Sequence, residues 1–140
     1  MLSDKQIELL KSESLKARDV SYSPYSKFRV GAALLTEDDQ IIIGANIENA
    51  SYGAAICAER TAMVKALTSG HRKFKAIGVA SDLTTPCSPC GICRQFVREF
   101  CTLDTPVYMF TTTGDYEMKT LSGLLPMSFG PEDLDHPLKK

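Results

Sequence analysis

The chain has 140 residues and a formal net charge of −1, and a chain of this length buries roughly 68–70% of its unfolded surface in one domain. Hydrophobic residues make up 44% and charged residues 24%, a globular balance that argues against intrinsic disorder. The near-neutral charge argues against a protein that binds nucleic acid mainly by charge, and no apolar run approaches the roughly 20 residues that span a bilayer.

The N-terminal sequence predicts a helix and not a targeting signal. The opening residues are MLSDKQIELL, which carry acid early and lack a basic start followed by an apolar run, so we expect no secretory signal. Ser3 and Gln6 match a capping box. Leu10 and Ala17 fall on one helical face, which predicts a helix over about 4–20.

The rest of the chain alternates strand and helix signals. After a proline break at 21–26, we expect strands at 27–35 and 40–45 joined by an acidic turn at 37–39, and then an irregular stretch at 46–55. A helix at 57–69, ended by Gly70, is followed by a strand at 75–80 and by a second helix with Ser88 as N-cap and Pro89 as first residue, which runs to about Phe100. We expect strands at 106–111 and 116–119, a helical turn at 121–125 and an extended tail at 126–140. This order predicts a sheet with helices on its faces, antiparallel at first and parallel later through crossovers.

Five cysteines carry the clearest chemical signal. They are Cys57, Cys87, Cys90, Cys93 and Cys101. Without a signal peptide we expect a reducing compartment, where clustered cysteines indicate metal ligands or reactive thiols before disulfides. Cys90 and Cys93 share one face at a predicted helix start, and Cys57 opens another helix, where the N-terminus favours the metal-binding thiolate. If adjacent parallel strands precede the two helices, three sulfurs converge.

Three converging thiolates suit a catalytic zinc, whose fourth position stays open to water. Glu59 follows the first ligand by two residues and could take a proton from that water. Arg60 and Arg94 lie near the ligands in sequence, and a hydrogen bond from either to a thiolate would offset the negative charge of the sulfurs.

Spacing alone leaves the ligand set open. The run Cys87-x-x-Cys90-x-x-Cys93 offers two overlapping pairs, and Cys57 with all three would make a closed structural site. The later pair is favoured because Ser88-Pro89 is the better helix start.

Longer sequence blocks extend the pattern beyond the cysteines. They are SPYSKFRVGAALL (23–35), GANIENASY (44–52), ICAERTAM (56–63), SPCGICRQF (88–96) and LLPMSFGPEDL (124–134). Together these blocks resemble the zinc nucleoside deaminases, in particular the small homotetrameric cytidine deaminase family. The resemblance covers about 21–134 of a single domain spanning 1–140, with 135–140 as a tail. It selects Cys90 and Cys93 as ligands and leaves Cys87 as an extra cysteine near the site.

The resemblance implies a three-layer α/β/α fold, with a mixed five-stranded sheet and helices on both faces. It implies one Zn²⁺ per subunit and hydrolytic deamination of cytidine and 2′-deoxycytidine, in which Glu59 carries protons to the pyrimidine N3 and then to departing ammonia. It also implies a homotetramer with active sites shared between subunits and with no nucleic-acid or membrane partner. We expect a cytoplasmic protein, in the cytosol, with the nucleus left open.

The same resemblance assigns substrate-binding residues position by position. Phe28 would pack on the base, and Ala58 would bind the pyrimidine carbonyl edge through its backbone. Asn46 and Glu48 would hydrogen-bond the ribose hydroxyls, and Ala50 and Tyr52 would line the same loop. Tyr25 would close the sugar end, and Phe129 would reach into a neighbouring subunit's site. Two alternatives stay open. One is a polynucleotide or base deaminase with the same zinc chemistry, against which the neutral charge counts. The other is a structural zinc-binding interaction module that uses four cysteines.

Overall fold

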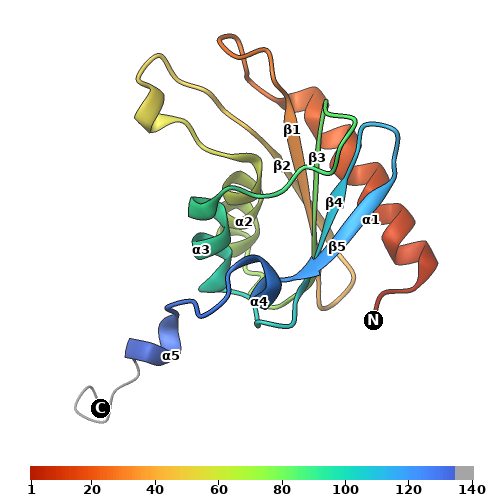
Figure 1. Cartoon of the computed structure of the whole chain (residues 1–140), viewed down its shortest axis with the longest axis vertical. Helices are drawn as coiled ribbons and strands as arrows, with labels where there is room; N and C mark the ends of the chain where they lie inside the picture. The colour runs from red at the N-terminus through yellow and green to blue at the C-terminus, as the bar shows by residue number, and fades with distance from the viewer. Residues whose placement is uncertain (135–140) are drawn as a thin grey trace.

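The computed structural model describes residues 1–134, which form a mixed five-stranded sheet between helical layers (Figure 1). The strands are β1 (Val30–Thr36), β2 (Ile41–Ala45), β3 (Phe74–Ser81), β4 (Pro106–Phe110) and β5 (Tyr116–Thr120), in the spatial order β2-β1-β3-β4-β5. Strands β3 and β4 run parallel, and the other neighbouring pairs run antiparallel. The mixed sheet predicted from the sequence is therefore confirmed, while the predicted tail at 135–140 lies outside the described residues.

Helices cover both faces of this sheet. They are α1 (Asp4–Ala17), α2 (Ala58–Thr68), α3 (Gly91–Arg98), α4 (Leu121–Leu124) and α5 (Pro131–Leu134), with short 3₁₀ turns at Arg18–Val20 and Tyr52–Ala54. Figure 1 shows α1 on one face and α2 and α3 side by side on the other. Within residues 1–134, no helix is both long and apolar enough to cross a membrane.

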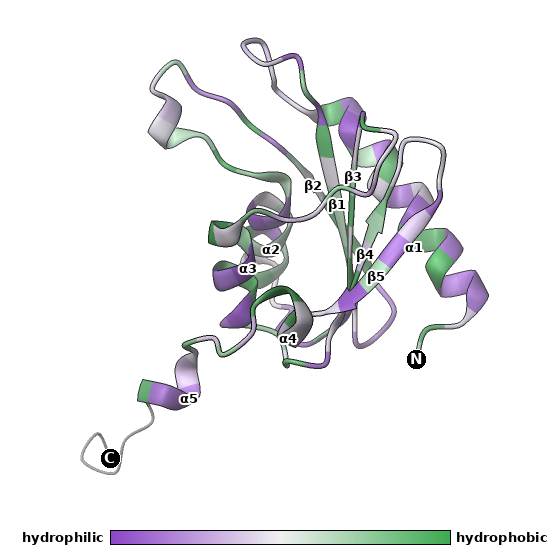
Figure 2. Ribbon diagram, viewed as in Figure 1, coloured by the Kyte–Doolittle hydropathy of each residue, from purple (hydrophilic) through white to green (hydrophobic). Residues whose placement is uncertain are grey.

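Strand alternation builds two separate cores, because successive side chains of a strand point to opposite faces. On β1, Ala32 and Leu34 join the core under α2 and α3, whereas Ala33 and Leu35 join the core under α1. The buried strands β3 and β4 alternate in the same way. Figure 2 shows the hydrophobic colouring of the inner strands against the more hydrophilic edge strand β5. The sheet is thus the middle layer of three, as expected.

The predicted element starts need two corrections. Helix α3 begins at Gly91 with Cys90 as its N-cap, not at Pro89 with Ser88 as cap, because the Ser88 hydroxyl accepts a hydrogen bond from the side chain of Arg94 instead. The sequence predicts an extended tail over 126–140, but within it Pro131–Leu134 forms the short helix α5. The capping box at the start of α1 is present as predicted.

Candidate active site

Two helix N-termini meet at one edge of the sheet. Helix α2 follows β2, and α3 follows the loop after β3. These two strands are not neighbours, because β1 lies between them, but both are antiparallel to β1 and therefore point the same way. The sequence predicts convergence if adjacent parallel strands precede the two helices, and the two strands share a direction without being adjacent. The first turns of α2 and α3 consequently lie side by side.

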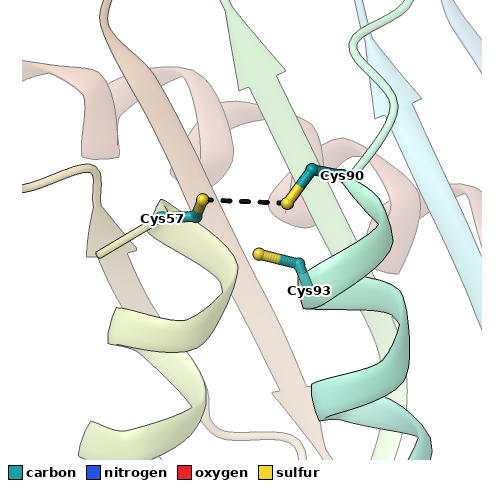
Figure 3. Close-up of side chains that lie close together, drawn as sticks. All are labelled: Cys57, Cys90 and Cys93. Carbon is teal, nitrogen blue, oxygen red and sulfur yellow. Dashed lines mark hydrogen bonds between the residues drawn. The ribbon is translucent and has the colours of Figure 1, made fainter. Parts of the chain in front are cut away.

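Three cysteine sulfurs converge between these helix ends (Figure 3). Cys57 is the N-cap of α2, Cys90 is the N-cap of α3, and Cys93 lies in the first turn of α3. The Sγ atoms of Cys57 and Cys90 are 3.9 Å apart, and all three sulfurs lie within 4.8 Å of one another. Cys87 is outside this cluster, which favours the three-cysteine ligand set over the closed four-cysteine one.

The sulfur cluster fits zinc. A tetrahedral ion with Zn–S bonds of about 2.3 Å separates its sulfurs by about 3.8 Å, close to the distance between Cys57 and Cys90. The hydrogen bond with Cys93 lowers the pKa of the Cys57 thiol well below its ordinary value, and Arg60 adds to this effect. Hydrogen bonding to Cys57 and burial raise the pKa of Cys93. Cys57 thus loses its proton readily, and a divalent cation bound by all three sulfurs would displace the two protons that remain.

The two arginines near the ligands have different partners. The Arg60 guanidinium donates to Cys57 Sγ at 3.6 Å, as the sequence predicts. Arg94 was predicted to do the same, but its guanidinium donates to the carbonyl oxygens of Pro89 at 2.8 Å and Leu124 at 2.6 Å. Arg94 therefore hydrogen-bonds the loop before α3 and the end of α4, and it makes no hydrogen bond to a sulfur among the described residues. Charge compensation at the sulfurs comes from Arg60.

Glu59 lies in the first turn of α2 with only 4% of its surface exposed. Together with Cys57, Ala58 and Cys90, it lines a cavity of about 190 Å³. Burial raises the pKa of the Glu59 carboxyl to about 7. A carboxyl with this pKa both accepts and donates a proton near neutral pH, which is what proton transfer to and from a substrate requires.

Cys87 and Cys101 are not ligands in this arrangement. Cys87 is half-buried and lines the same cavity as Glu59, so it is the extra cysteine near the site that the sequence predicts. Cys101 packs against the apolar core, and burial raises the pKa of its thiol to about 12, which keeps it protonated. Neither thiol is positioned to replace one of the three clustered sulfurs.

Asn46 holds the backbone around Phe28. Its Nδ2 donates to the Phe28 carbonyl at 2.8 Å, and its Oδ1 accepts from the Val30 N–H at 2.9 Å and from the Ser21 hydroxyl. Asn46 also lines the cavity that contains Glu59. The side chain therefore joins the start of β1 to the wall of the site.

Glu48 lines a second cavity of about 320 Å³, between the turn that contains Tyr25 and Ser26 and the loop that follows β2. Its Oε1 accepts from the backbone N–H groups of Tyr25 at 3.0 Å and Ser26 at 3.1 Å, and its Oε2 accepts from the Ser26 hydroxyl. The Ser26 hydrogen bond contributes most to lowering the pKa of Glu48. Tyr25 and Tyr52 line this cavity with their rings edge to face at 6.0 Å.

Some predicted site residues lie outside both cavities. Phe28 is half-buried and Ala50 is exposed, and neither lines the two cavities. Phe129 is 59% exposed on the segment before α5, where Gln95 Nε2 donates to its carbonyl at 2.9 Å. The ring is therefore presented outward from its own chain. The sequence reasoning missed Ser26, although it lies within the block SPYSKFRVGAALL.

Comparison with known proteins agrees with this geometry. Residues 4–109 match the family model described as the cytidine and deoxycytidylate deaminase zinc-binding region. The chain is 52% identical over 130 residues to a cytidine deaminase of Sporosarcina psychrophila, covering 93% of this chain and 96% of that protein. It is 50% identical over 128 residues to one of Halalkalibacterium halodurans, covering 91% and 97%. The solved cytidine deaminase of Burkholderia pseudomallei superposes with a TM-score of 0.85 at 40% identity, covering 91% of this chain and all of that one.

Proposed function

The chain belongs to the family of cytidine deaminases, and we propose on that basis how its own residues carry out the reaction. The reaction is the zinc-dependent hydrolytic deamination of cytidine and 2′-deoxycytidine to uridine and 2′-deoxyuridine, with release of ammonia. One observation carries this conclusion. The buried Glu59 carboxyl and two of the three clustered sulfurs line the same cavity.

Cys57, Cys90 and Cys93 are the residues that would hold the metal. When bound, zinc supplies the Lewis acidity that makes water a nucleophile at neutral pH, as in zinc deaminases generally. Glu59 takes one proton from the attacking water and gives it to the pyrimidine N3. It then takes the second proton of that oxygen, now bonded to the ring carbon C4, and gives it to the amino group, which leaves as ammonia. Its pKa of about 7 suits both directions of transfer.

The remaining pocket residues bind and orient the nucleoside. The backbone of Ala58, at the first turn of α2, binds the pyrimidine carbonyl edge, and the Phe28 ring packs on the base. Asn46 and Glu48 hydrogen-bond the ribose hydroxyls from the loop that follows β2. Ala50 and Tyr52 lie on this loop, and Tyr25 closes its sugar end, supported by the edge-to-face contact of the two tyrosine rings.

We propose that the working unit is a homotetramer of single-domain chains (1–140). Phe129 supports this assembly. Its exposed side chain lies on a segment that is hydrogen-bonded to Gln95 of α3, and it lines neither of the two cavities described above. The ring would complete a neighbouring subunit's site. The proposed location is the cytoplasm, a reducing compartment in which five free thiols persist.

Catalysis is tested by cytidine turnover in an ultraviolet assay alongside metal analysis of the same sample. Zinc-loaded, folded protein that leaves cytidine unchanged would refute the assignment. Glu59→Ala should keep its zinc and lose turnover by a factor of about 10² or more. Retained turnover would remove Glu59 from the reaction.

The alternatives make different predictions. A structural four-cysteine module requires Cys87→Ser to release zinc, whereas the three-ligand site keeps zinc in that variant and loses it in Cys93→Ser. A polynucleotide deaminase requires tight binding of single-stranded DNA or RNA at physiological salt. Shared sites predict that inactive Phe129→Ala and Glu59→Ala subunits regain turnover when mixed and reassembled, and an active monomer by light scattering would refute the tetramer.

A further inference from the structure

We propose that Ser26 is a positioning residue, whose hydroxyl group links the Glu48 carboxylate to the backbone of Phe28. The link fixes the position of the aromatic ring relative to the carboxylate. The inference rests on the proposed function, because Phe28 and Glu48 are the residues proposed to hold the base and the ribose.

The Ser26 hydroxyl is engaged as both donor and acceptor. It donates its hydrogen to Glu48 Oε2 and accepts the Phe28 N–H at 3.0 Å. A hydroxyl has one hydrogen to donate, and here that hydrogen is directed at the carboxylate. The contact to a charged acceptor is stronger than one between neutral groups, so the hydroxyl orientation is well defined.

The backbone between these contacts is bent in a way that needs support. Lys27 lies between Ser26 and Phe28 and has a φ of 59°, in the left-handed region that non-glycine residues seldom adopt. Its N–H donates to the carbonyl of Ser23 at 3.0 Å. This bend brings the Ser26 hydroxyl next to the Phe28 N–H, so the strained turn and the hydrogen bond hold each other in place.

Phe28 is thereby held at both of its backbone polar groups. Ser26 binds its N–H, and Asn46 donates to its carbonyl at 2.8 Å. Both of these hydrogen bonds involve the proposed ribose-binding side chains. Ser26 is hydrogen-bonded to Glu48, and Asn46 is itself one of the two ribose-binding residues and lines the cavity that contains Glu59. A movement of the ribose-binding groups is therefore transmitted to the aromatic ring, and the reverse holds.

Loss of the Ser26 hydroxyl should affect binding more than chemistry. Ser26 is exposed, so its truncation leaves no core cavity. Glu48 would keep the two backbone N–H groups of Tyr25 and Ser26, while the Phe28 N–H and one carboxylate oxygen would lose their partner. Glu59 lies on α2 and shares no hydrogen bond with Ser26 or Phe28, so its own role in proton transfer should be retained.

The steady-state test compares Ser26→Ala, Ser26→Thr and the matched control Ser51→Ala. Ser51 is also an exposed loop serine, and its hydrogen bonds within residues 1–134 are made by its backbone. Ser26→Ala should raise KM for cytidine by about tenfold with kcat within about threefold of wild type, the pattern of lost binding and not of lost chemistry. Ser26→Thr keeps the hydroxyl and should restore KM, and Ser51→Ala should match wild type.

Amide hydrogen exchange measured by NMR tests the link without using activity. The Phe28 N–H should exchange faster in Ser26→Ala than in wild type or Ser51→Ala, because its acceptor is gone. An unchanged KM, a fall in kcat alone, a failure of Ser26→Thr to rescue, or unchanged exchange would each overturn the proposal. Wild-type protein that does not deaminate cytidine would instead overturn the proposed function, while the exchange result still decides whether Ser26 holds Phe28.

Discussion

The Arg60 guanidinium donates to Cys57 Sγ at 3.6 Å, from one turn further along the same helix. Three thiolates around a divalent ion leave a net charge of −1, which weakens the ion as a Lewis acid. The guanidinium offsets part of this charge and is itself half-buried, where its field is screened less than at the surface. In the proposed site, Arg60 would therefore tune a metal centre that it does not ligate.

Replacing Arg60 should therefore reduce turnover in a charge-dependent manner. Arg60→Gln should lower kcat/KM by about 10–100-fold, as expected for partners that surround a metal site, and Arg60→Lys should lose less because the positive charge remains. Zinc content is measured on each sample, so that lost metal is distinguished from a weaker metal centre. Full kcat/KM in Arg60→Gln at full zinc occupancy would contradict this role.

Gly44 permits the close packing of β2 against the helix that carries Glu59. A Cβ atom at Gly44 would lie 2.4 Å from the backbone nitrogen of Ala62 and 2.8 Å from its Cα. Both are backbone atoms of a helix, which cannot move aside as the end of a flexible side chain can. Gly44→Ala should lower the free energy of unfolding by about 1–3 kcal/mol, the range for overpacked sites. Urea denaturation at fixed protein concentration measures this.

The matched control is Gly53→Ala, because a Cβ at Gly53 meets no atom within 4 Å. Gly53→Ala should change the free energy of unfolding by less than about 0.5 kcal/mol. Equal stabilities for the two variants would show that α2 shifts freely against β2, and the close packing would then not fix the position of α2.

The clustering of the three cysteines was predictable because their signal is local. Cys57, Cys90 and Cys93 lie at helix starts, and spacing alone places the last two on one helical face. The element order also predicts that the strands before α2 and α3 run in the same direction, which brings the starts of the two helices together. The element order does not predict that β1 lies between those two strands.

The start of α3 was not predictable from the local pattern. Ser88-Pro89 has the composition of an N-cap and first helical residue, but the Ser88 hydroxyl is taken by Arg94, whose guanidinium also reaches the distant Leu124 carbonyl. The role of Ser26 depends in turn on the positive φ of Lys27, a conformation that a lysine in the sequence does not signal. Contacts over long sequence distance thus decide what local propensity leaves open.

Ser14 carries a buried hydroxyl with no hydrogen-bond partner in the described part of the chain. It faces β3 so closely that a Cβ at Gly78 would lie 2.4 Å from its Oγ. Ser14→Ala removes an unpaired polar group and adds a better helix former, so it should raise the free energy of unfolding by about 1 kcal/mol or more. Ser12→Ala, on the exposed face of the same helix, reports the propensity gain alone. A gain at Ser14 no larger than that at Ser12 would show that the hydroxyl is satisfied.

Asp82 joins three segments of the fold through one carboxylate. Its Oδ1 accepts from Arg29 at 2.8 Å and from Arg18 at 3.1 Å, and its Oδ2 accepts from the Arg29 backbone N–H at 3.2 Å. The Arg29 hydrogen bond contributes most to holding the pKa of Asp82 below its usual range, and the charge of Arg18 adds to it. The group is partly exposed, so solvent screening limits its contribution to about 1 kcal/mol.

This depressed pKa sets the pH range over which Asp82 stabilises the fold. The unfolded state, with an ordinary aspartate pKa of about 3.9, binds the proton first as the pH falls. The stabilisation is therefore complete above that value and is lost as the pH falls through the lower pKa of the folded protein. The difference in free energy of unfolding between wild type and Asp82→Asn should be about 1 kcal/mol at both about pH 7 and about pH 5, and should shrink at about pH 3. Urea denaturation at the three pH values measures it, and a difference that stays constant down to the lowest pH would mean that the carboxylate charge does not stabilise these contacts.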